Sequence, residues 1–134
     1  MNRIEKALDL SCNNYNCAQS VFAAYSEIFN IPENLAKQIS AGFGSGIGKT
    51  DNICGAISGA IMVMGLKYYT ELGTVEAKEK IYKISKDYVD KFKSLHKSDN
   101  CNVLLDLKEK GNFECQRYIQ SACEILEEEF LKVE

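Results

Sequence analysis

Four of the six cysteines stand at similar distances after an asparagine or an aspartate. The pairs are Asn14 and Cys17, Asp51 and Cys54, Asp99 and Cys101, and Asn112 and Cys115. Asparagine and aspartate are preferred helix N-caps, so we expect each of these cysteines in the first turn of a helix. The unpaired backbone donors and the partial positive charge of a helix N-terminus favour a thiolate there.

Four thiolates in such positions form a chemically coherent ligand set. A metal ion or an iron–sulfur cluster would compensate their charge, while the helix termini stabilise the remaining negative charge. The sequence therefore predicts an iron–sulfur cluster or other metal centre bound by Cys17, Cys54, Cys101 and Cys115. Two alternatives stay open, a structural zinc site or interaction module and metal-free thiol–disulfide chemistry. Any single cysteine on an apolar stripe is equally consistent with core packing.

Cys12 and Cys123 do not share this spacing. Cys12 falls in a polar gap between two predicted helices, and Cys123 falls within the last helix beside its apolar stripe. We interpret both as packing residues. Cys123 lies two turns beyond Cys115 on nearly the same side of the helix, so a role as a resolving thiol is a minor hypothesis.

Residues 41–66 combine alternating glycines, a polar corner and a long apolar run. Glycines in this segment would let a cofactor or another backbone approach closely, and we predict cofactor contacts at Gly44, Gly46, Gly48, Gly55 and Gly59. Glycine within a helix costs about 1 kcal/mol relative to alanine. The last two of these glycines therefore indicate a packing requirement or a binding site.

The glycine-rich segment is similar to a phosphate-binding loop, but its spacing differs. That motif requires a glycine at position 43, where Phe43 stands, and the preceding segment has a helical pattern instead of a strand pattern. We therefore do not expect a nucleotide site. A glycine-rich turn that enters a helix remains a predicted cradle for an anion or a cofactor.

Apolar residues recur with helical spacing along most of the chain, and no stretch alternates like a strand. We predict an all-α, compact single-domain bundle (residues 1–134) of about six or seven helices, with a central apolar helix that follows the glycine-rich loop. In the helix over 31–41, Leu35, Ala36 and Ile39 are the apolar positions. The predicted helices are 3–10, 14–29, 31–41, 52–70, 74–95, 101–110 and 112 to near the C-terminus.

The net charge and the distribution of charged and apolar residues exclude several classes of partner. The net charge is −3 and the basic residues are dispersed, which excludes a strong electrostatic footprint for nucleic acid or an anionic membrane. The longest apolar run, Ile53 to Leu66, is too short to cross a bilayer. The charged N-terminus does not look like a signal peptide. We therefore expect a cytoplasmic protein, whose cysteines serve metal or redox chemistry and not a set of structural disulfides.

The sequence gives little support for other common metal-binding or catalytic sites. The chain has no Cys-x-x-Cys pair, which argues against a thioredoxin-type motif or a zinc ribbon. Its one histidine, His96, ends a lysine-rich helix and is expected to cap it. A catalytic site of histidine and carboxylate ligands is therefore not predicted. The sequence leaves enzymatic activity, electron partner and oligomeric state open.

The order Cys54-Gly55-Ala56-Ile57-Ser58-Gly59, together with residues 16–21, 42–48 and 62–67, resembles a family of small redox-active proteins. That family is defined by a CGAxxG motif and four characteristic cysteines. The resemblance covers nearly the whole chain and maps those cysteines to Cys17, Cys54, Cys101 and Cys115. It implies a prosthetic group such as an iron–sulfur cluster, and an association with an oxidoreductase or a transporter system.

Overall fold

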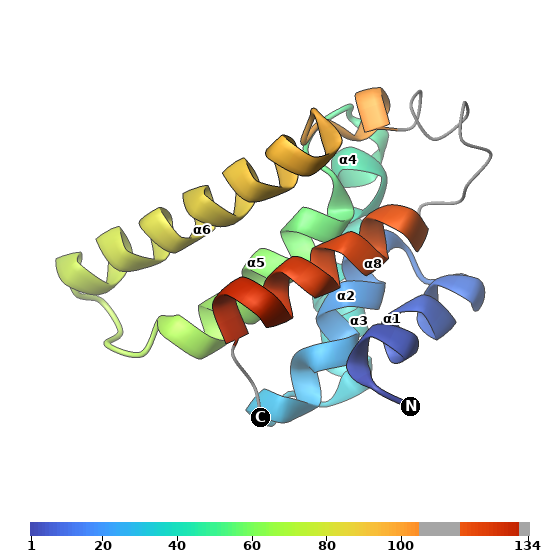
Figure 1. Cartoon of the computed structure of the whole chain (residues 1–134). Helices are drawn as coiled ribbons and strands as arrows, with labels where there is room; N and C mark the ends of the chain where they lie inside the picture. Colours follow the sequence, from blue (N-terminus) through green and yellow to red (C-terminus); the bar gives the residue numbers. More distant parts are fainter. Residues whose placement is uncertain (105–115, 132–134) are drawn as a thin grey trace.

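The computed structural model describes residues 1–104 and 116–131 and shows an all-α fold, as predicted (Figure 1). No strand occurs in these two ranges; the one β-type contact there is an isolated antiparallel bridge between Ile53 and Asn100. Residues 101–104 are also helical. The elements are α1 (Arg3–Cys12), α2 (Cys17–Ser26), η1 (Glu27–Phe29), α3 (Glu33–Ser40), η2 (Ala41–Phe43), α4 (Gly44–Lys49), α5 (Gly55–Tyr68), α6 (Val75–His96), α8 (Gln116–Ile125) and the π-helical turn η3 (Leu126–Leu131).

Helices α2 and α5 pack against each other at the centre of the bundle. The predicted central apolar helix corresponds to α5, in which Ile57, Ala60 and Val63 are fully buried. Gly59 allows the two helices to approach closely, because a Cβ added at this position would lie 2.7 Å from the carbonyl oxygen of Ala18 in α2. This glycine therefore serves the approach of another backbone, one of the two roles expected from the sequence.

The long helix α6 covers α5 and α8, and the three run side by side in Figure 1. Its start is capped by Thr74, whose hydroxyl accepts a hydrogen bond from the Ala77 N–H at 3.1 Å. Tyr88 and Phe92 enter the core, and the Tyr88 hydroxyl donates to the Ala122 carbonyl of α8 at 2.6 Å. No helix in the described residues has the length and apolarity needed to cross a membrane.

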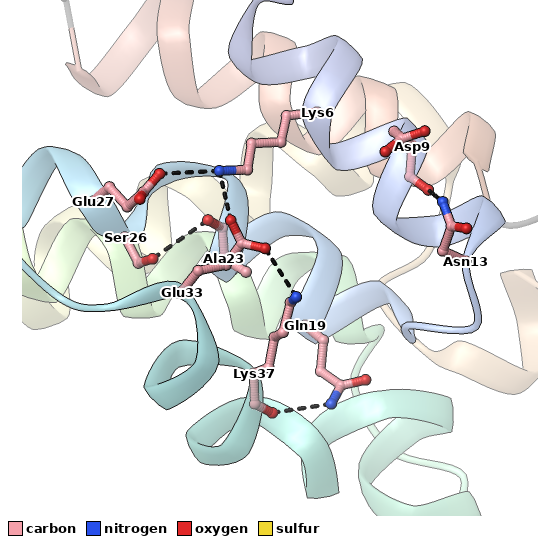
Figure 2. Close-up of polar contacts among 9 residues, drawn as sticks. All are labelled: Lys6, Asp9, Asn13, Gln19, Ala23, Ser26, Glu27, Glu33 and Lys37. Carbon is pink, nitrogen blue, oxygen red and sulfur yellow. Dashed lines mark hydrogen bonds and ion pairs between the residues drawn. The ribbon is translucent and has the colours of Figure 1, made fainter.

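A network of ion pairs joins α1, η1 and α3 (Figure 2). The Lys6 ammonium lies 3.0 Å from a Glu27 carboxylate oxygen and 2.7 Å from one of Glu33. Lys37 also pairs with Glu33, at 2.8 Å, and its carbonyl accepts a hydrogen bond from the Gln19 side chain of α2 at 2.9 Å. Hydrogen bonds from Lys37 and Lys6 lower the pKa of Glu33. The network orients α1 and α3 beside α2.

Candidate functional site

The glycine-rich segment forms a left-handed turn. Five consecutive residues, 45–49, have positive φ angles between 54° and 66°. Gly46 and Gly48 adopt this conformation without penalty, whereas Ile47 and the other side-chain-bearing residues cost roughly 1–2 kcal/mol each. Hydrogen bonds from the Thr50 hydroxyl to the carbonyls of Gly46 (3.0 Å) and Ile47 (2.6 Å) hold the turn. Backbone strain of this kind is concentrated at functional sites in proteins.

Cys17 is the first residue of α2, and its N-cap is Asn16. The Asn16 side chain accepts from the Gln19 N–H at 2.9 Å, and the Gln19 side chain accepts from the Asn16 N–H at 3.0 Å, which completes a capping box. The predicted cap, Asn14, was wrong. Asn14 has a φ of 74° and lies before the helix.

Cys54 itself occupies the N-cap position of α5, with extended backbone angles (φ −57°, ψ 132°). The predicted cap, Asp51, was also wrong, because it lies three residues upstream in a left-handed conformation (φ 64°). The helix starts later than expected because residues 52–54 pair with the segment that follows α6. The Cys54 N–H donates to the Asp99 carbonyl at 2.7 Å.

Cys101 begins the helical residues 101–104, and its N–H donates to the Asn52 carbonyl at 2.8 Å. Asn100 caps this turn through its side-chain oxygen, which accepts from the Val103 N–H at 3.1 Å. The predicted cap, Asp99, instead uses its backbone carbonyl to bind Cys54. All three of these cysteines thus stand at helix starts, although with caps other than those predicted. Cys115 and its predicted cap Asn112 lie outside the described residues.

One cavity of about 200 Å³ brings the three cysteines together. Cys54 is buried, at 5% exposure, and the other two are half-buried. No three cysteine, histidine or carboxylate side chains in residues 1–104 and 116–131 are arranged to hold a single metal ion. The cysteines thus line the walls of this space, which we call the cysteine cavity. Its lining is Ser11, Tyr15, Asn16, Cys17, Ser45, Cys54, Gly55, Cys101, Leu104 and Tyr118.

Three of the glycines that are predicted to contact a cofactor pack closely against the segments that carry the cysteines. A Cβ at Gly44 would lie 2.3 Å from Cγ of Asn16, a Cβ at Gly46 would lie 2.9 Å from Cβ of Cys101, and a Cβ at Gly55 would lie 3.3 Å from Cβ of Cys17. These glycines let the chain segments around the cavity approach one another. Gly55 also lines the cavity. Cofactor contact by these three residues, Gly48 and Gly59 stays a prediction.

Two tyrosines that the sequence analysis did not select also line the cavity. Tyr118 follows Cys115 by three residues in the sequence, a spacing that could have identified it. Its hydroxyl donates to the Leu104 carbonyl at 2.9 Å. Tyr15 lies under the Lys37 ammonium, which is 4.3 Å from the ring centroid. Both residues thus form part of the wall around the cysteines.

The two remaining cysteines have different surroundings. Cys12 is exposed, and its sulfur accepts a hydrogen bond from the Gln116 side chain at 2.8 Å. Cys123 is fully buried in α8, and burial raises the pKa of its thiol to about 12. This environment favours the packing role for Cys123, since the thiolate is the reactive form.

We expect thiol reagents at pH 8 to modify Cys12 rapidly and Cys123 only after unfolding. With its pKa near 12, about one Cys123 thiol in 10⁴ is ionised at this pH. Mass mapping of alkylated protein, with and without denaturant, measures both residues in one experiment. Rapid modification of Cys123 in the folded protein would contradict the packing role and revive the resolving-thiol hypothesis.

The fold and the cavity define a class: a small all-α protein in which cysteines from separate helix starts surround one partly apolar cavity. A family model described as "Putative redox-active protein (C_GCAxxG_C_C)" matches residues 15–129, and the chain belongs to this family. It is also similar to an uncharacterized protein of Archaeoglobus fulgidus, with 31% identity over 90% of this chain and 87% of the relative. No solved structure gives a significant match.

Proposed function

We propose that this protein is a redox protein that binds an iron–sulfur cluster through Cys17, Cys54, Cys101 and Cys115. The observation that carries the proposal is the cysteine cavity, which collects three of these residues from three separate helix starts. A cluster distributes thiolate ligands over several iron atoms. Cysteines on different walls of one cavity suit such a centre, and the family description supports redox activity.

The residues around the cavity would stabilise an anionic centre. Helix starts at Cys17 and Cys54 direct partial positive charge toward it. The rings of Tyr15 and Tyr118, with the Leu104 side chain, would lower the local dielectric and keep water away. When bound, the cluster would supply one-electron transfer. We further propose that the protein works in the cytoplasm and exchanges electrons with an oxidoreductase or a transporter system.

Metal and sulfide analysis of anaerobically purified protein tests this proposal. We expect iron, acid-labile sulfide and a charge-transfer absorption that a reductant bleaches. If both iron and this absorption are absent, even after reconstitution, the proposal of an iron–sulfur cluster is contradicted. Stoichiometric zinc in a colourless protein that shows no redox reaction in electrochemical measurements would instead support the structural zinc module.

A second candidate function is metal-free thiol–disulfide exchange, favoured by the pairing between the segments of Cys54 and Cys101. The Ile53–Asn100 bridge and its hydrogen bonds hold these two segments side by side. In such a reaction two thiols would form one disulfide and release two protons, while two electrons reduce an acceptor disulfide. Mass mapping after mild oxidation of metal-free protein would then show one specific and reversible pair. Four inert thiols would exclude this function.

A further inference from the structure

A second hollow, of about 550 Å³, lies near the cysteine cavity and contains the chain's one histidine. Its walls come from α1, the end of α6 and one face of α8. We call it the histidine hollow, and none of the three described cavity cysteines, Cys17, Cys54 and Cys101, lines it. Its lining residues are Leu8, His96, Gln116, Arg117, Gln120, Ser121 and Glu124.

His96 is held in this hollow by contacts on several sides. Its Nε2 lies 2.7 Å from the Ser121 hydroxyl of α8. Its ring centroid is 4.6 Å from that of Phe92 and 5.1 Å from that of Tyr118, with the tyrosine ring edge-on. The C-cap of α6 is Lys97, so the imidazole packs between α6 and α8 and does not cap the helix as expected from the sequence.

The surroundings of His96 favour its neutral form. Burial, followed by the positive charge of Arg117, lowers the pKa of the imidazole. Among the described residues that line the hollow, the other charged group is Glu124 on α8. The Cys12 thiol of α1 is hydrogen-bonded to the side chain of Gln116, which also lines the hollow. Leu8, which α1 contributes to the wall, has no charge.

Tyr118 connects the histidine hollow to the cysteine cavity. Its ring contacts His96 and also lines the cysteine cavity, and its hydroxyl is bound to the Leu104 carbonyl on that cavity's wall. A protein ring between the two sites screens charge far less than water does. A change of charge among the cysteines would therefore affect the imidazole.

We propose that His96 takes up the proton that accompanies reduction of the cysteine centre. This inference rests on the proposed redox function. One electron from an external one-electron donor enters the centre, and one proton from solvent binds the imidazole through the open histidine hollow. The Ser121 hydroxyl can donate to neutral Nε2 or, after rotation, accept from protonated Nε2. Its contact with the ring is thus kept in both states.

NMR titration of His96 in the oxidised and reduced protein tests the proposal directly, because one histidine gives one ring Hε1 signal. A unit charge about 10 Å away at an effective dielectric of about 20 shifts a pKa by about one unit. We expect the pKa of His96 to be higher in the reduced protein by about this amount. If the pKa of His96 is equal in the oxidised and reduced proteins, although the two states differ in absorption or thiol content, the inference is overturned. The proposed redox function is not affected by that result.

A second experiment does not depend on a redox centre. In metal-free Cys12→Ser protein, the thiols of the cysteine cavity are alkylated with iodoacetate or with iodoacetamide, and mass mapping confirms the modified positions. The two adducts have similar size and differ by one negative charge at each modified thiol. We expect a higher pKa of His96 with the iodoacetate adduct, whereas the same value with both adducts would overturn the inference.

The matched control for both titrations is Ser121→Ala. This variant removes the hydroxyl that contacts His96 and leaves Tyr118 in place. We expect it to move the pKa of His96 equally in both states, so that the difference between states persists. Loss of the difference would show that the signal follows a rearrangement of the Ser121 contact, and would overturn electrostatic coupling through Tyr118.

Discussion

Gly59→Ala is expected to lower the free energy of unfolding by about 1–3 kcal/mol, the usual cost of overpacking a tight core. The new Cβ would lie 2.7 Å from the carbonyl oxygen of Ala18 and 3.0 Å from Cβ of Val21. The nearest of these is a backbone atom in the first turn of α2, so relief requires the two central helices to move apart. This cost exceeds the roughly 1 kcal/mol by which alanine improves helix propensity. Denaturant unfolding followed by circular dichroism measures the change.

The matched control for this effect is Gly65→Ala in the same helix. A Cβ at Gly65 meets nothing within 4 Å in the described structure. We therefore expect Gly65→Ala to raise the free energy of unfolding by up to about 1 kcal/mol. A Gly59→Ala protein that gains stability like the control would contradict the close approach of α2 and α5.

Cys54→Ser is expected to abolish the cysteine centre while the fold is kept. Cys54 is the most buried of the three described cavity cysteines and occupies the N-cap of α5. Serine is a preferred N-cap residue of nearly the same size, so the free energy of unfolding of the metal-free protein should stay equal or rise by up to about 1 kcal/mol. Loss of a thiolate ligand should reduce bound iron and visible absorption tenfold or more, since even supporting residues contribute 10–100-fold.

The comparison for this variant is Cys12→Ser. Cys12 is exposed and does not line the cysteine cavity, so its substitution should leave iron content and absorption unchanged. Both proteins are reconstituted in parallel, and iron, sulfide and unfolding are measured on the same samples. Full iron and an unchanged spectrum in Cys54→Ser would remove this residue from the ligand set.

The cysteine cavity is assembled from segments with strong geometric requirements. The left-handed turn over 45–49 supplies Ser45 to the cavity wall. Gly46 in the same turn packs against Asn52 and Cys101. Since Asn52 and Cys101 are also joined by a backbone hydrogen bond, the strained turn is braced by the segments that position two of the cysteines. Its conformational cost is thus balanced by contacts that build the site.

Local sequence patterns were sufficient for the fold class and for the placement of cysteines near helix starts. Helical periodicity arises from contacts between residues three and four positions apart, and it identified the helices over 3–10 and 74–95 to within a few residues. N-cap chemistry is also local. It therefore correctly indicated helix starts near Cys17, Cys54 and Cys101, although the caps belong to neighbouring residues.

Tertiary structure decided the features that depend on distant partners. Cys54 became an N-cap because its N–H binds Asp99, far along the chain. Of the apolar positions on α3, Ala36 is buried, whereas Leu35 and Ile39 are 45% and 49% exposed. The meeting of three cysteines in one cavity, and the contact of His96 with Tyr118 beside it, likewise depend on how the helices pack. Local spacing shows which side chains share a helix face, and only long-range packing determines what that face meets.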